Sequence, residues 1–352
     1  MVRKTTLPFV IGLLLLVGLA ACGNDGKQKP TAAPTENPAY VIGYSAPELI
    51  AGQRGIMEAL VRHAEGMGWS VQAANANSDP ATQAEQIEYF ISSGVDVVVA
   101  VPVDSQRICE TVEKVQQAHI PFYTIDRAPI GCSINMTVLS DNFMAGQQSG
   151  EELVRLLTAR YGRPSGKVLE LQGDLRQNVA LERGGGFHVV VDEYPAIEVI
   201  SRPTEWQPDQ IDMATREVLN DTPVDAIYLH SDCAGVPVVL PILSQMGKEL
   251  PRTSDDHIFI VGVDGCAETL QAIRDGFVDQ ASGQPISDFG IIVRWIDLER
   301  QGQPIEAGPV IEAGALWSPA MLEQSDTGWQ LFLATASITP ANVDDPGLWG
   351  NQ

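Results

Sequence analysis

The sequence predicts an α/β protein of two similar lobes, each a parallel sheet flanked by helices, joined by a multi-strand hinge. Short apolar runs alternate with segments of helical periodicity from Tyr40 onward, and this alternation is typical of parallel sheets covered on both faces. The alternation begins again after Asn142, which indicates a second unit of similar size. About 310 residues follow the N-terminal region, enough for two lobes with sizeable cores.

The first half of the chain contains the strands and helices of one predicted lobe. Strands are expected where apolar residues run almost without interruption, at residues 41–46, 70–76, 95–103 and 120–126. Helices are expected between them, where apolar residues recur every three to four positions, at residues 55–68, 81–94 and 106–118. This strict alternation predicts a parallel sheet with a helix after each of the first three strands.

The second half repeats the pattern with a helix in front. Helices are expected at residues 150–162, 178–193, 210–220, 238–247 and 268–276. Strands are expected at residues 167–173, 197–203, 225–231 and 258–264. The remaining region, 283–352, is less regular and is expected to cross between the lobes.

The lobe boundaries follow from this order. The N-terminal lobe is expected to comprise residues 40–141 and about 285–313, and the C-terminal lobe residues 142–284 and about 314–345. Hinge strands are expected near residues 140–142, 284–285 and roughly 310–315.

The N-terminus reads as an export signal rather than as part of the fold. Two basic residues, Arg3 and Lys4, precede the apolar stretch 9–19, which is too short for a comfortable membrane span. The stretch ends in Leu-Ala-Ala-Cys, which resembles the lipobox of bacterial lipoproteins and makes Cys22 the expected acylated residue. Residues 23–39 are expected to form a flexible tether. The predicted location is the cell envelope, with the protein lipid-anchored on the extracytoplasmic side of a bacterial membrane.

Charge and cysteine content exclude several classes of protein. Acidic residues outnumber basic residues 45 to 22, for a formal net charge of −23, and so acidic a chain repels nucleic acid. The five cysteines and five histidines have no metal-ligand spacing, so neither a metal nor a cofactor is expected. An exported protein permits disulfides, and two pairings stay open, Cys109 with Cys132 and Cys233 with Cys266.

Polar residues follow nearly every predicted strand. Ligands of open parallel sheets bind beyond the carboxyl ends of the strands. The strand ends to consider are residues 46–48, 103–105, 126–127, 173–178, 204–206, 231–232 and 264–265. One Asp in such a place is ordinarily a helix cap, but a series of polar ends from two lobes indicates a shared binding site.

Seven segments in order resemble one known family. They are QIEYFISSGVDVVVAVPVDS (86–105), IPFYTIDR (120–127), SDNFMAGQQSGEEL (140–153), NVALERGGGF (178–187), SDCAG (231–235), VGVDG (261–265) and QPISDFG (284–290). They are similar to sugar-type periplasmic binding proteins, such as the ribose- and galactose-binding receptors of ABC transporters, and to the ligand-binding cores of the lactose-repressor family. The resemblance implies the type I periplasmic binding protein fold. It also implies a monomer that captures a monosaccharide or polyol by hinge closure and delivers it to an ABC permease.

The resemblance also assigns ligand contacts. The matching positions are Asp126, Arg127, Arg183, Trp206, Asp264 and Gln284. A carboxylate accepts from adjacent hydroxyls while a guanidinium donates to others. Trp206 is read either as an aromatic face for the sugar or as a structural residue. Replacing Asp126 or Arg183 by Ala is expected to abolish binding with little loss of stability.

Two departures from the family concern the ligand's identity. Where ribose-type receptors have Asn-Pro followed by two aromatics, this chain reads Ile-Ala-Gly-Gln at 50–53. Gln53 and Glu48 are candidate polar replacements, although Glu48 also suits a solvated loop. Ser231 stands where the family has Asn, so that contact is expected to be lost or to move to Asp232 or a water.

Other classes of function fit less well. Asp126 and Asp264 mimic the two carboxylates of a glycosidase, but a carboxylate beside an arginine titrates too low to act as the general acid. A repressor needs an N-terminal DNA-binding domain, and a signal and tether occupy that place. A sensory receptor that feeds a chemoreceptor or histidine kinase remains the alternative to transport, and neighbouring genes would separate the two.

Overall fold

The first lobe contains a mostly parallel sheet and its helices, as expected. The computed structural model describes residues 40–49 and 51–352, so the predicted signal, lipobox Cys22 and tether lie outside the described residues. The elements are β1 (Val41–Ala46), α1 (Ala51–Gly66), β2 (Ser70–Asn75), α2 (Pro80–Ser93), β3 (Val97–Ala100), α3 (Ile108–Gln117), β4 (Phe122–Ile125) and β5 (Met136–Ser140). Helix α2 shows why these boundaries form, because Asp79 accepts from the first free backbone N–H groups and Gly94 ends the helix at a φ of 74°.

The second lobe repeats the arrangement. Its elements are α4 (Asn142–Tyr161), β6 (Gly166–Gln172), α5 (Asn178–Val191), β7 (Ile197–Pro203), α6 (Pro208–Asp221), β8 (Ala226–Leu229), α7 (Asp232–Gln245), β9 (Phe259–Asp264), α8 (Ala267–Asp275) and β10 (Gln280–Gly283). Strands β3, β4 and β8 are buried along their whole length, which fits parallel sheets covered on both faces.

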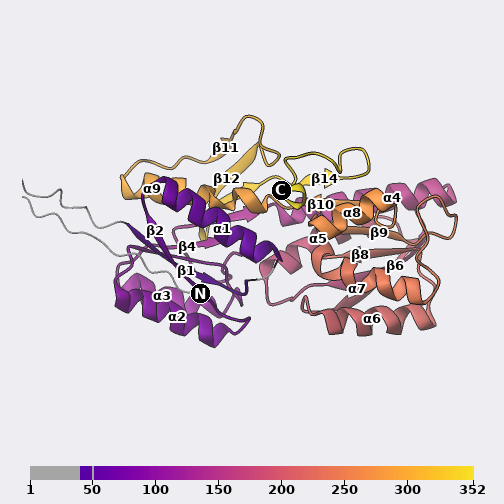
Figure 1. Ribbon diagram of the computed structural model, residues 1–352, viewed down its shortest axis with the longest axis horizontal. Coiled ribbons are helices and arrows are strands. Elements are labelled where there is room, and N and C mark those ends of the chain that lie inside the picture. Colours follow the sequence, from indigo (N-terminus) through magenta and orange to yellow (C-terminus); the bar gives the residue numbers. More distant parts are fainter. Residues whose placement is uncertain (1–39, 50) are drawn as a thin grey trace, which may run out of the picture. The chain divides into compact units, whose positions relative to one another are not determined.

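The C-terminal region returns to both lobes. Its elements are η1 (Ile286–Ile291), α9 (Ile292–Arg300), β11 (Gly308–Val310), β12 (Ala320–Ser325), β13 (Gly328–Leu333), β14 (Ala336–Ile338) and η2 (Trp349–Asn351). Within the described residues, one sheet has eight strands in the order β11-β12-β13-β5-β4-β3-β1-β2, and the other has six in the order β14-β10-β9-β8-β6-β7. In the described part of the eight-stranded sheet, only β11–β12 and β12–β13 pair antiparallel. Figure 1 shows β11 and β12 beside the first lobe and β14 beside β10.

The expected boundary of the second lobe is wrong in this region. The sequence predicts that the region of about 314–345 belongs to the C-terminal lobe, but β12 and β13 belong to the first sheet. Strand β13 pairs in parallel with β5, and its Leu331 and Leu333 are buried in the first hydrophobic core. The third crossing therefore lies between Leu333 and Ala336, not near residues 310–315.

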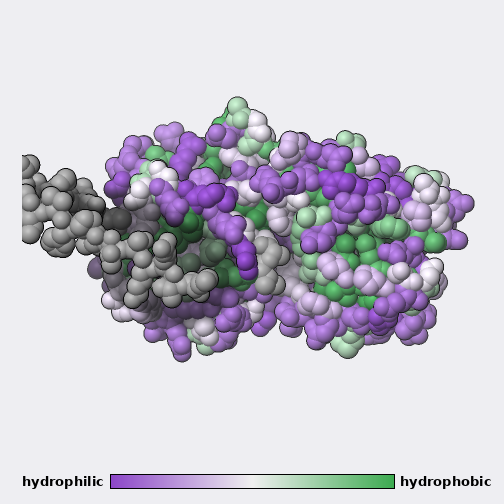
Figure 2. All heavy atoms as spheres, in the orientation of Figure 1, coloured by the Kyte–Doolittle hydropathy of each residue, from purple (hydrophilic) through white to green (hydrophobic). Residues whose placement is uncertain are grey.

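The face of the molecule in Figure 2 is mostly hydrophilic over the described residues, with smaller apolar patches on both lobes. Each lobe has its own apolar interior, and that of the first includes Tyr44 and Tyr123. Leu169 and Ile260 lie in the second. Among the helices that the structure describes, none has the length and hydrophobicity needed to cross a bilayer.

One of the two open cysteine pairings is present as a disulfide. Cys109 of α3 is bonded to Cys132 in the loop before β5, with their Cα atoms 5.6 Å apart. Cys233 and Cys266 are free thiols within the described part of the chain. The disulfide closes a loop of 23 residues around β4, the strand that leads to Asp126.

Replacing Cys109 and Cys132 together by Ser is expected to lower the free energy of unfolding by about 2–4 kcal/mol, because the open loop gains entropy in the unfolded chain. Urea denaturation of the double variant and the unreduced wild type would measure the loss. The double Ser variant of Cys233 and Cys266 is the control. Equal stability of the Cys109/Cys132 variant and the wild type would contradict the prediction.

A buried carboxylate in β6 is held by two histidines. Glu170 accepts from His230 Nε2 at 2.9 Å and from His188 Nε2 at 3.2 Å. Burial alone would raise the pKa of Glu170, but these hydrogen bonds outweigh it and lower the pKa to about 2. The hydrogen bond to Glu170 raises the pKa of His188 to about 9. A charged pair therefore stabilises the second lobe around neutral pH.

Replacing Glu170 by Gln is expected to destabilise the protein more at pH 5.5 than at pH 9.5. The folded pKa of His188 lies above its ordinary value of 6.5, so its contribution is complete below that pH and is lost as the pH rises through about 9. The depressed pKa of Glu170 makes its contribution complete above about 4.5. Urea unfolding of both proteins at the two pH values checks this, and an equal difference at both would contradict it.

Candidate functional site

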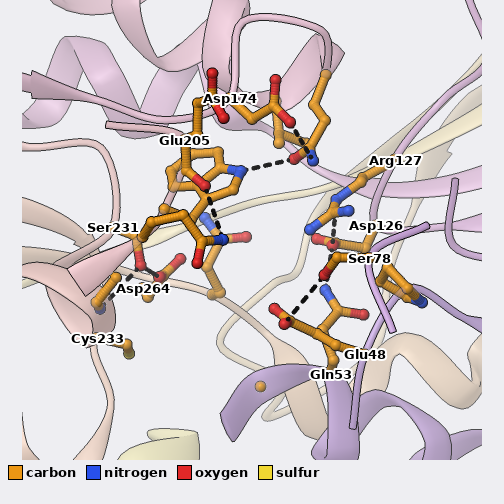
Figure 3. A pocket seen from close by; sticks show the side chains of 18 of the residues that line it. Glu48, Gln53, Ser78, Asp126, Arg127, Asp174, Glu205, Ser231, Cys233 and Asp264 are labelled. Atoms are coloured by element: carbon orange, nitrogen blue, oxygen red, sulfur yellow. Dashed lines mark hydrogen bonds and ion pairs between the residues drawn. The ribbon is translucent and has the colours of Figure 1, made fainter. Parts of the chain in front are cut away.

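A cavity of about 590 Å³ lies between the two lobes, where strands of both sheets end. Nine of the ten residues predicted for ligand binding line it. They are Glu48, Gln53, Asp126, Arg127, Arg183, Trp206, Ser231, Asp264 and Gln284. Figure 3 shows Gln53, Asp126 and Arg127 on one side of this pocket and Ser231 and Asp264 on the other. The structure thus brings polar strand ends from both lobes to one place, as expected.

The first-lobe side is built around Asp126 and Arg127, directly after β4. Both are more than nine-tenths buried. Arg127 Nε lies 3.7 Å from Asp126 Oδ2, and Arg127 Nη1 donates to the carbonyl of Pro102 at 3.1 Å. Burial lowers the pKa of Arg127, although the neighbouring Asp126 opposes this. Two buried charges that contact each other only loosely are available to a further partner.

Gln53 reaches Asp126 from α1. Its Nε2 donates to Asp126 Oδ2 at 2.8 Å, so the predicted replacement for the family's aromatic loop faces the same cavity as the charged pair. Glu48 lies farther out and accepts from Ser78 Oγ at 3.4 Å. Figure 3 shows both interactions on the same side of the pocket.

The second-lobe side is built around Arg183 and Asp264. Arg183 Nη1 lies 3.1 Å from Asp264 Oδ1, and Arg183 Nε donates to Asn142 Oδ1 at 2.9 Å. Ser231 Oγ donates to Asp264 Oδ2 at 2.5 Å while it caps α7 at the N–H of Ala234. Burial raises the pKa of Asp264, and Arg183 partly offsets that rise. Ser231 therefore positions Asp264 by a hydrogen bond, a contact that the sequence did not predict.

The glycines beside Arg183 bring two helices together. A Cβ on Gly186 would lie 2.0 Å from the carbonyl oxygen of Phe143, and one on Gly146 would lie 2.2 Å from that of Arg183. Helices α4 and α5 can approach this closely only with glycine at both places. The run Arg-Gly-Gly-Gly-Phe is thus a packing motif that sets Arg183 beside Asn142, at the start of α4.

Trp206 makes structural contacts and also lines the cavity. Its Nε1 donates to Gln177 Oε1 at 2.8 Å, and its ring occupies the space where a Cβ on Gly173 would lie. The ring nevertheless lines the cavity, 5.8 Å from the Arg183 guanidinium carbon.

Three of the predicted ligand contacts that line the cavity have a positive φ, which is unusual for a residue with a side chain. The angles are 65° at Asp126, 63° at Trp206 and 129° at Asp264. Such backbone conformations cost free energy and concentrate at functional sites. All three residues directly end strands or begin the loops that follow them, so the local backbone turns these side chains toward the cavity.

Asp232 is the exception among the predicted site residues, because it does not line the cavity. It is fully buried and accepts from the N–H of Gly265 at 3.1 Å and from Thr269 Oγ1 at 2.7 Å. Burial raises the pKa of Asp232, and the charge of Asp264 raises it further. As the first residue of α7, it turns toward the start of α8. Of the alternatives for the family's Asn contact, its transfer to Asp232 is therefore wrong, while its loss or its transfer to a water stays a prediction.

The prediction missed Trp349, which also lines the cavity. It belongs to the C-terminal tail and follows no strand, so a search of strand ends could not find it. The one available signal was a large aromatic residue in a tail segment of otherwise mostly small or polar residues, Asp-Asp-Pro-Gly-Leu-Trp-Gly-Asn.

Several buried polar atoms of this site have no hydrogen-bond partner among the residues that the structure describes. They are Gln53 Oε1, Arg127 Nε, and both Nε2 and Oε1 of Gln284. Buried polar groups are ordinarily paired, so this set of donors and acceptors suits a small molecule that both donates and accepts, as hydroxyl groups do.

The described lining carries more acids than bases. The acids are Glu48, Asp126, Asp174, Glu205 and Asp264, and the bases are Arg127, Arg176 and Arg183. A lining with excess negative charge disfavours an anionic ligand.

Comparisons with known proteins agree with this geometry. Residues 51–294 match a family model described as "Periplasmic binding protein domain". The xylitol-binding protein of Mycolicibacterium smegmatis is 25% identical over 331 residues, which cover 93% of this chain and 83% of that protein. The ribose import binding protein RbsB of Bacillus subtilis is 26% identical over 76% of this chain and 83% of its own length. A solute-binding protein of Bacillus halodurans with bound myo-inositol superposes with a TM-score of 0.74 at 22% identity, over 89% of this chain and 99% of that one.

Proposed function

Because the chain belongs to the periplasmic binding protein domain family, we propose that it captures a neutral monosaccharide or related polyol in the cavity between its lobes. One observation carries this proposal: Gln53, Arg127 and Gln284 line a single cavity, and each has a buried donor or acceptor without a protein partner in the described part of the chain. Hydroxyl groups of one ligand would satisfy both kinds of atom.

The charged residues support hydroxyl recognition further. Asp126 accepts from adjacent hydroxyls, and the Arg127 guanidinium donates to others in a fixed fork. The excess of acids in the lining favours a neutral ligand over a sugar phosphate or a uronic acid. The named relatives bind xylitol and ribose, both of which are neutral and polyhydroxylated.

The mechanism follows from the position of the cavity. Chain crossings after β5, β10 and β13 connect the lobes within the described residues. A ligand that contacts Asp126 in one lobe and Asp264 in the other stabilises an arrangement with the lobes together, and so it shifts the equilibrium toward a closed form. Capture of this kind needs no covalent step, and the relatives are likewise binding proteins.

The cellular role that we propose is that of a monomeric lipoprotein, anchored by Cys22 in the cell envelope, that delivers its ligand to an ABC permease. The lipobox-like sequence at 19–22 supports the anchor. The match to a ribose import binding protein supports the importer as partner.

A thermal-shift panel tests the proposed ligand class. Xylitol, D-ribose, L-arabinose and myo-inositol are the neutral probes, and D-ribose 5-phosphate and D-glucuronate are the anionic comparators. At least one neutral probe is expected to raise the unfolding midpoint, since a ligand at 100 times its Kd stabilises by about 2.7 kcal/mol. The proposal fails if no neutral probe stabilises the protein or if an anion stabilises it more than every neutral probe does.

A further inference from the structure

The C-terminal tail contacts both lobes at the edge of the cavity. Arg274 of α8 holds it to the second lobe, because its Nη2 donates to Asn351 Oδ1 at 2.7 Å and to the carbonyl of Val343 at 3.1 Å. On the other side, Ser287 of η1 donates to Gln352 Oε1 at 2.6 Å. The tail therefore has a fixed course across the region where the chain passes from one lobe to the other.

The backbone around Trp349 fits closely against the strand end that bears Asp264. A Cβ on Gly350 would lie 2.5 Å from the carbonyl oxygen of Gly265. Leu348 is buried in the second-lobe core. These neighbours fix the position of Trp349 from both sides.

Trp349 is half-buried, packs against the hydrophobic core of the first lobe and lines the cavity. Its Nε1 donates to the carbonyl of Asp264 at 2.8 Å. This N–H is the only donor of an indole, so the ring offers the cavity its carbon surface and not a hydrogen bond. Asp264, Gln284 and Ile286 line the same cavity.

In the described lining, Trp206 and Trp349 are the only aromatic residues. The start of α1 in the first lobe contributes Gly52 and Gln53 instead of an aromatic pair. Aromatic faces pack well against the C–H face of a ring compound, and large rigid rings give much contact at low entropic cost.

From these contacts we infer that Trp349 is a ligand-contacting residue that selects for cyclic ligands. Its indole forms an apolar wall of the site, and the C-terminal tail is part of the binding site. This inference rests on the proposed function. It adds a residue and a preference for a ring with a C–H face.

The test measures the affinity of the full protein for its tightest-binding cyclic probe among D-ribose, L-arabinose and myo-inositol. Trp349→Leu is expected to weaken binding by about tenfold. Trp349→Phe keeps a ring but loses the hydrogen bond to Asp264, and it is expected to stay within about threefold of the wild type. The control is Trp329→Leu, because Trp329 is also half-buried against the first-lobe core but does not line the cavity; its affinity should not change.

Each outcome separates the inference from the proposed function. If Trp349→Leu binds the cyclic probe as tightly as the wild type, or if Trp349→Phe loses as much as Trp349→Leu, the ring contact is refuted while the proposed function stands. If no cyclic probe binds the wild type, the inference about Trp349 fails. The proposed function still stands in that case if xylitol binds.

A second measurement tests the inference even if Trp349→Leu does not fold. The indole N–H signal of Trp349, identified by its absence from the NMR spectrum of Trp349→Phe, is expected to shift when the cyclic probe is added to the wild type. A static Trp349 signal during saturation would overturn the inference.

Discussion

Asp126→Asn is expected to lower the affinity for the neutral ligand by at least about a hundredfold, because hydrogen bonds to a charged group contribute about 1.5–3 kcal/mol each. The substitution keeps the size of the side chain and removes its charge. Asn also tolerates the positive φ of 65° at this position, where Ala would add backbone strain. Isothermal titration with the tightest-binding neutral probe measures the loss.

The matched control is Glu205→Gln. Glu205 also lines the cavity, but it is exposed and forms no ion pair among the described residues. Its affinity is expected to stay within about threefold of the wild type. Equal losses in the two variants would mean that the overall charge of the pocket matters and that Asp126 has no specific role.

Arg183→Ala is expected to abolish measurable binding and also to lower the free energy of unfolding by about 3 kcal/mol, because it leaves a buried carboxylate without its partner. Arg183 is buried and holds Asp264, Asn142 and the carbonyl of His230. The sequence predicted little loss of stability here, and these contacts contradict that expectation. Urea denaturation measures the loss.

Two further variants separate the causes. Arg202→Ala removes a second-lobe arginine that is paired with Glu217 at 3.2 Å on the surface, and it is expected to cost less than about 1 kcal/mol. Combining Arg183→Ala with Asp264→Asn should recover part of the lost stability, since no charged carboxylate is then left unpaired. A double variant that is less stable than Arg183→Ala would refute the proposed burial cost.

Much of the site was predictable because ligands of parallel sheets bind beyond the carboxyl ends of the strands. Asp126 and Asp264 follow apolar runs that alternate with helices, and parallel strands bring such ends to one edge. The apolar period is a local property of the sequence. For that reason the apolar runs alone showed that Asp126 and Asp264 end strands, without knowledge of how the strands are arranged.

Other features depend on tertiary packing that no local pattern reports. Asp232 follows a strand as well, but its carboxylate turns to Gly265 and Thr269, and the sequence does not record that direction. Strand β13 belongs to the first sheet because Leu331 and Leu333 pack there. Trp349 reaches the cavity only because the tail docks beside α8.

Hydrogen exchange with and without the tightest-binding neutral probe tests most directly the central claim that one ligand contacts both lobes. Slower exchange is expected on both sides of the cavity, in segment 126–128 and in segment 264–266, and no such protection is expected in Asp126→Asn at the same probe concentration. Slower exchange in only one of the two segments at saturating probe, or unchanged exchange in both, would contradict the claim that one ligand contacts both lobes.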